Sequence, residues 1–134
     1  MPHPAPTTIL RVALPLPPLR LFDYAPPAGH VPGPADVGCR VRVPFGPREL
    51  VGVVAEVGTP DPAADGRLRP ALALLDAEPL LQGELLRSLQ WLARYTHAPL
   101  GEVLATALPA ALRRGEPLPD THAWAWRLTE AGTA

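Results

Sequence analysis

The chain has 134 residues, 47% of them apolar, and a formal net charge of −1. This length suits one domain of ordinary size with its own core. The near-neutral charge excludes a generic polyanion binder with a long basic surface, and the single cysteine, Cys39, excludes an internal disulfide and a cysteine-based zinc site. With no apolar run of 18 residues and no evident signal peptide, we expect a cytoplasmic protein without a membrane contact.

The 20 prolines favour short helices and strands. Residues 1–8 are polar and rich in proline, and we expect them to be flexible. Residues 9–14 have the composition of a first strand, which Pro15 and Pro17 end. Residues 21–24 follow as a short extended segment.

Arginine and valine alternate over residues 40–43, the pattern of a half-buried strand. The alternation places both arginines on one face and both valines on the other. Residues 44–47 form a turn, and residues 49–57 return as an apolar strand in which Gly52 indicates a bulge or a close approach. Cys39 is predicted to be a small core residue. Residues 72–75 complete a small, barrel-like, curled antiparallel sheet.

The apolar period then changes from that of a strand to that of a helix. The leucines that share one helical face are Leu81, Leu85, Leu89 and Leu92. They predict a helix over residues 84–96, with Trp91 in the core and His97 capping its end. A second helix is expected over residues 100–108. The predicted fold class is therefore α+β, a curled antiparallel sheet with two C-terminal helices.

The segment Phe22-Asp23-Tyr24 holds one acid between two aromatic residues. In an extended segment, Asp23 points to the face opposite both rings unless the chain bends. Two interpretations stay open at this point. The rings and the acid form a nucleotide pocket, or the rings belong to the core and Asp23 stabilises the turn before Pro26.

Several motifs, taken in order, resemble the N-terminal domain of the primosomal replication-restart helicases, the PriA family. They lie at residues 14–17, 22–24, 40–46, 52–54, 91–95, 99–104, 107–109 and 112–115. The resemblance covers roughly residues 10 to 115 and implies a domain that grips the 3′ end of a DNA strand at a stalled fork. The composition predicts a flexible N-terminus at 1–8 and a linker at 113–120, and the resemblance implies the 3′-end domain at 9–112 and the truncated start of a winged-helix domain at 121–134. We therefore expect an N-terminal piece of a longer protein.

The resemblance also assigns a site. The residues it implies for the DNA 3′ end are Phe22, Asp23, Tyr24, Gly46 and Arg69. Arg40, Arg42 and Arg48 are expected as secondary DNA contacts, with a solvated strand face as the alternative for Arg40 and Arg42. An ionised Asp23 accepts a hydrogen bond from a terminal hydroxyl but repels a phosphodiester, so it distinguishes an ending strand from a continuing one.

No catalytic or metal-binding residue is predicted, because Asp23 has no histidine or nucleophile placed beside it in a recognisable motif. The fragment is expected to be neither an enzyme nor a cofactor carrier. ATP, Mg and Zn are implied only for the resembled full-length 3′-5′ DNA helicase. The implied partners are DNA with a free 3′ end, forked DNA, primosome proteins and single-stranded-DNA-binding protein. The alternative function is a small barrel that serves only interdomain or protein-protein contacts.

Overall fold

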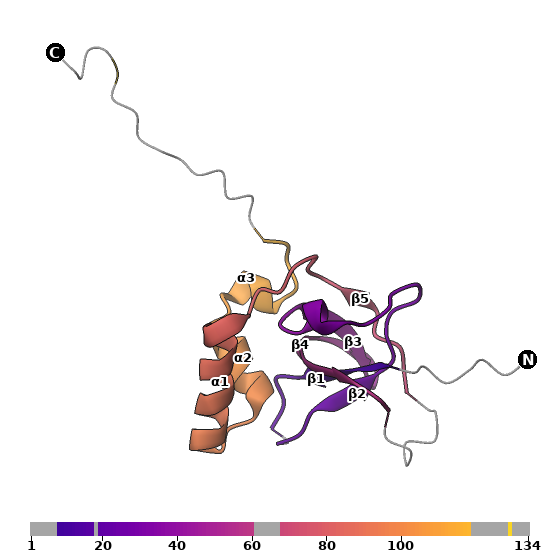
Figure 1. Cartoon of the computed structure of the whole chain (residues 1–134), viewed down its shortest axis with the longest axis horizontal. Coiled ribbons are helices and arrows are strands. Elements are labelled where there is room, and N and C mark those ends of the chain that lie inside the picture. The colour runs from indigo at the N-terminus through magenta and orange to yellow at the C-terminus, as the bar shows by residue number, and fades with distance from the viewer. Residues whose placement is uncertain (1–7, 18, 61–67, 119–128, 130–134) are drawn as a thin grey trace, which may run out of the picture.

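The computed structural model describes residues 8–17, 19–60, 68–118 and 129 (Figure 1). The expected flexible N-terminus and winged-helix start lie outside this part of the chain, apart from residues 8 and 129. The described elements are β1 (Ile9–Ala13), β2 (Phe22–Tyr24), the 3-10 helix η1 (Pro34–Asp36), β3 (Arg40–Phe45), β4 (Arg48–Gly58), β5 (Ala73–Leu74), α1 (Gly83–Thr96), α2 (Leu100–Ala107) and α3 (Ala110–Arg113).

The strands form one antiparallel sheet in the order β2-β1-β4-β3-β5. The segment that leads into the edge strand β5 bonds both to the chain just beyond the other edge strand, β2, and to β3. The N–H of Ala71 donates to the carbonyl of Ala25 beyond β2 at 2.8 Å, and the N–H of Leu72 donates to the carbonyl of Arg42 in β3 at 2.8 Å. The sheet therefore curls until its two edges approach each other, which confirms the predicted α+β class with a curled sheet.

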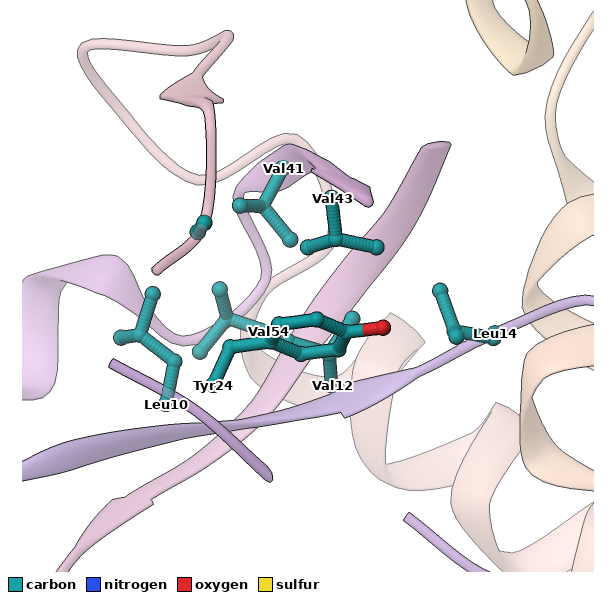
Figure 2. Packing of buried hydrophobic residues seen from close by; sticks show 8 residues of the cluster. Leu10, Val12, Leu14, Tyr24, Val41, Val43 and Val54 are labelled. Carbon is teal, nitrogen blue, oxygen red and sulfur yellow. The ribbon is translucent and has the colours of Figure 1, made fainter. Parts of the chain in front are cut away.

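The concave face of the sheet holds the first core. Its members alternate along the strands, as a period of two residues requires. Figure 2 shows the ring of Tyr24 among the aliphatic side chains of the neighbouring strands. The buried residues of this core are Leu10, Val12, Leu14, Tyr24, Val41, Val43, Val54 and Ala71.

The convex face of the sheet packs against the helices, which gather on one side of it (Figure 1). A register shift pairs Arg11 with Glu56 but Val12 with Val54, which leaves Ala55 as the extra residue of a bulge. Ala55 is buried in this second core, and Glu56 beside it is exposed. The predicted close approach at Gly52 is confirmed, because a Cβ there would lie 2.6 Å from Cγ1 of Val12.

The helices begin and end close to the predicted residues, and α3 is an addition that the sequence pattern did not indicate. The prediction for Trp91 was wrong: its side chain is 56% exposed and stacks on Tyr95 with ring centroids 4.9 Å apart. Leu86 and Ala93 provide the buried side of α1. At 3.6 residues per turn, Trp91 lies about 140° around the helix from Leu86. None of the helices in the described part of the chain is long and apolar enough to cross a membrane.

Arg40 joins β3 to the C-terminal end of the domain. It is 1% exposed, and its guanidinium bonds the carboxylate of Asp76 through Nη2 at 2.7 Å. Its Nη1 donates to the carbonyls of Leu112 at 3.0 Å and Glu116 at 2.6 Å. The chain therefore packs onto the domain as far as Glu116, four residues past the expected boundary at 112.

Cys39 is 1% exposed, so its prediction as a small core residue is confirmed. Burial, together with the negative charges of Asp76 and Asp36, raises the pKa of this thiol from 9.0 to about 11. Because the thiolate is the reactive species, we expect a thiol reagent at pH 8 to label Cys39 slowly in the folded protein and rapidly in denaturant. Rapid labelling without denaturant would contradict this placement.

The same shift links Cys39 to the stability of the fold. As the pH rises from 9 to 11, the unfolded thiol ionises first, so the unfolded state binds fewer protons than the folded state. The free energy of unfolding is therefore expected to fall over this range. A Cys39→Ala variant should show a shallower fall when denaturant midpoints are compared at each pH.

Candidate nucleic-acid interface

The edge strand β2 carries the three residues of the predicted motif and directs them to two faces. Tyr24 points into the concave core, where it is 6% exposed and its hydroxyl donates to the carbonyl of Pro44 at 2.7 Å. Burial raises the pKa of Tyr24, and the positive charge of Arg69 partly opposes this rise. Tyr24 therefore holds β2 against β3, while Phe22 on the same face stays half-buried.

Phe22 lies beside the turn that contains Gly46. Its ring meets that of Phe45 edge to face, with centroids 5.7 Å apart and planes at 86°. Gly46 follows Phe45 with a φ of +58°, a conformation that favours glycine, and a Cβ there would meet nothing within 4 Å. Phe22 and Gly46 are thus both neighbours of Phe45, and the space beside Gly46 that a Cβ would occupy is open.

Arg69 is held next to the end of β2. Its carbonyl accepts a hydrogen bond from the N–H of Ala25 at 3.0 Å, and Ala25 forms an isolated parallel bridge with Pro70. Arg69 is exposed. Backbone pairing across the gap between the sheet edges therefore places this guanidinium near Tyr24, although the two residues are far apart in sequence.

Asp23 points to the convex face, opposite both rings. Its Oδ1 lies 3.8 Å from Nε of Arg11, and both side chains are 28% exposed. Arg11 also lies 3.8 Å from Glu56 and donates to the carbonyl of Thr59 at 2.8 Å. Within the described part of the chain, the Asp23 carboxylate accepts no hydrogen bond, so its acceptor capacity is available to a ligand.

The three arginines expected as secondary contacts differ in their environments. Arg40 is buried, and its guanidinium bonds Asp76 and backbone carbonyls. The predictions that Arg40 contacts DNA or lies on a solvated strand face were therefore both wrong. Arg42 is half-exposed, with Nη1 3.9 Å from Glu49. Arg48 is exposed at the start of β4, paired across the turn with Phe45.

Sequence reasoning missed three side chains of this region. Arg11 faces Asp23 from β1, Phe45 supports Phe22, and Arg20 lies with its guanidinium carbon 4.7 Å from the centre of the Phe22 ring. The alternation of residues 9–13 could have placed Arg11 on the convex face, but only strand pairing identifies its partner. Within the described residues, no three His, Cys, Asp or Glu side chains gather to hold a metal ion.

Around the edge strand β2, the half-buried Phe22 ring, the partly exposed Asp23 carboxylate and the exposed Arg69 are side chains of the kinds that contact nucleic acid. The family described as the 3′ DNA-binding domain (3′BD) of PriA matches residues 11–109. The chain belongs to this family of DNA-binding domains.

Individual relatives agree with this assignment. The chain is 40% identical over 124 residues to the replication restart protein PriA of Haemophilus influenzae. The matched region covers 92% of this chain and 17% of that protein. It is 37% identical over 94 residues to PriA of Bacillus subtilis, covering 70% of this chain and 12% of that protein. The chain thus spans less than a fifth of the length of these curated relatives.

Proposed function

We propose that this chain binds the 3′ end of a DNA strand and distinguishes a terminal hydroxyl from a continuing phosphodiester. The observation that carries the proposal is the position of Asp23. Its carboxylate is partly exposed on the edge strand β2 and has Arg11 as a distant ion-pair partner, 3.8 Å away. The match to a 3′ DNA-binding domain family supports the same function.

The discrimination follows from the charge of the carboxylate. A hydroxyl can donate a hydrogen bond to Asp23, an interaction of about 1.5–3 kcal/mol for a charged acceptor. A 3′-phosphate offers no equivalent donor and adds a negative charge at the same place. Asp23 thus favours a strand that ends and disfavours one that continues.

A terminal nucleotide that lies across the edge of β2 can reach groups on both faces, because Asp23 points to the convex face whereas Phe22, and Phe45 beside Gly46, lie on the concave side. Phe22 offers a ring for stacking, worth about 1–3 kcal/mol for any base, and Gly46 leaves the turn open to a sugar or base. The exposed guanidinium of Arg69 can pair with a phosphate. Along a β-strand, the backbone N–H and C=O groups of successive residues point alternately to the two sides of the strand. The N–H and C=O of Asp23 therefore point to the same side of β2 as those of Ala25, which bond Arg69 and Ala71.

The proposal extends to the longer protein that the relatives represent. There the domain would place a replication restart helicase on forked DNA, with ATP, Mg and Zn used by other parts of that protein. Primosome proteins and single-stranded-DNA-binding protein are proposed as its partners, and the cytoplasm as its location.

A titration with labelled oligonucleotides that differ only at the 3′ terminus tests the proposal. We expect the unmodified strand to bind at least about tenfold more tightly than the 3′-phosphorylated one, since 1.4 kcal/mol corresponds to a factor of ten. The Asp23→Asn variant should bring this ratio toward one, because it removes the charge and keeps the shape.

Glu56→Gln is the matched control for this variant. Glu56 is the second carboxylate beside Arg11, also 3.8 Å from the guanidinium, and its side chain is 60% exposed. This variant should keep the preference for the 3′ hydroxyl. Equal binding of the two oligonucleotides by the unmodified protein would refute 3′-end recognition.

One observation favours contact with protein as a second function. Leu85, Trp91, Leu92 and Tyr95 of α1 are exposed by 53%, 56%, 41% and 71%. Exposed aromatic residues commonly anchor protein interfaces. If the chain serves such contacts alone, the same titration should detect no DNA binding at low salt.

A further inference from the structure

A groove runs between the convex face of the sheet and the C-terminal half of α1. Its volume is about 670 Å³, within the usual range for a ligand site. Leu21 and Ala55 line it from the sheet side, and Arg94 and His97 line it from α1 and its C-terminal end. Arg20 and Glu56 add charged groups. We call this cavity the α1 groove.

The charge of the α1 groove is predominantly positive. Arg20 and Arg94 contribute two guanidiniums, and neither has a carboxylate within ion-pair distance in the described part of the chain. Glu56 is the acidic residue of the lining, and Arg11 lies 3.8 Å from it. Guanidiniums without a carboxylate partner recognise phosphate well, because their planar donors match its oxygens.

The α1 groove adjoins the proposed 3′-end site. Leu21 and Asp23 are two residues apart in an extended segment, so they share the convex face. Arg11 lies between Asp23 and Glu56, with 3.8 Å to each carboxylate. Arg20 also links the α1 groove to the proposed 3′-end site, since it lines the groove and its guanidinium carbon lies 4.7 Å from the centre of the Phe22 ring.

We propose that the α1 groove binds the phosphate backbone of the DNA strand immediately 5′ of the terminal nucleotide. The inference rests on the proposed function, because it takes Asp23 as the position of the strand end. From a terminal 3′ hydroxyl the strand can continue only in the 5′ direction. The adjoining groove offers space and positive charge along such a path.

The Arg94→Gln variant tests this assignment, and Arg87→Gln is its matched control. Both arginines are exposed on α1, but Arg87 does not line the α1 groove. We expect Arg94→Gln to weaken oligonucleotide binding several-fold and to reduce the slope of log K against log salt by about 0.7 for one lost phosphate contact on a single strand. Arg87→Gln should leave the slope unchanged. Arg20→Gln provides a second groove variant.

An oligonucleotide with neutral methylphosphonate linkages next to its 3′ end locates the contact. The unmodified protein should bind it less tightly than the natural strand, whereas Arg94→Gln should distinguish the two poorly. Equal losses from Arg94→Gln and Arg87→Gln, or an unchanged salt slope in Arg94→Gln, would overturn the proposal.

The 3′-hydroxyl preference separates the two hypotheses. Arg94→Gln should retain the preference, because Asp23 is unchanged. If the unmodified protein has no such preference, the proposed function fails, while a smaller salt slope confined to the groove variants would still support phosphate binding there. If the preference is present but the slope does not change, only the groove assignment fails.

Discussion

Replacing Arg40 with methionine is expected to lower the free energy of unfolding by about 3–5 kcal/mol, the usual cost of removing one partner of a buried ion pair. The substitution leaves the Asp76 carboxylate, which is 4% exposed, without its guanidinium partner. It also removes the two bonds from Nη1 to Leu112 and Glu116, which hold the end of the domain against β3. Denaturant unfolding of the purified chain measures the loss.

Arg42→Met is the matched control for Arg40→Met. Arg42 lies two residues further along β3, and its ion pair with Glu49 is longer, at 3.9 Å, and more exposed. Pairs of this kind contribute about 0–1 kcal/mol. A double substitution, Arg40→Met with Asp76→Leu, should recover part of the stability because it also removes the buried carboxylate. Equal losses from Arg40→Met and Arg42→Met would contradict the structural role assigned to Arg40.

Replacing Gly101 with alanine is expected to destabilise the protein by roughly 1–3 kcal/mol or more, the range for overpacking a dense contact. Gly101 lies in the first turn of α2, and a Cβ there would come within 1.7 Å of the carbonyl oxygen of Leu14. Neither backbone can move aside without separating α2 from the chain that leaves β1. Leu104, which is fully buried on the same helix, would then lose part of its packing.

Ala107→Gly is the control that measures the effect of helix propensity on stability without this clash. Ala107 is exposed at the end of α2, so glycine there should cost no more than about 1 kcal/mol through the backbone alone. By propensity, Gly101→Ala should stabilise α2 by a similar amount. We expect both substitutions to destabilise the protein in denaturant unfolding. A more stable Gly101→Ala variant would show that α2 and β1 are not in close contact.

Much of the fold could be predicted from local pattern. The alternation in residues 40–43 placed Val41 and Val43 in the core, and the leucine spacing predicted a helix close to the observed α1. The same reasoning was wrong for Trp91. Size and apolarity favour burial, but Trp91 lies on the side of α1 away from the sheet, and the direction a helix faces depends on its packing.

The candidate site was predictable in part for the same reason. Alternation along β2 placed Asp23 opposite Phe22 and Tyr24, and the structure separates the two rings further, with Tyr24 in the core and Phe22 half-buried. The pairing of Asp23 with Arg11 depends on the register between β1 and β2. The α1 groove could not be predicted, because its lining comes from segments that only packing brings together.

The side-chain patterns along each strand and helix could be inferred from the sequence alone, together with a family resemblance that the match to the 3′ DNA-binding domain family confirms. Such patterns are local, because they repeat every two residues in a strand and every 3.6 in a helix. Arg40 and Arg42 occupy the same face of β3, but Arg40 is buried and Arg42 is half-exposed because of contacts that form only in the folded chain. The physical reason is that Arg40 meets Asp76 and Leu112, partners 36 and 72 residues away, and no local period can specify contacts at such separations.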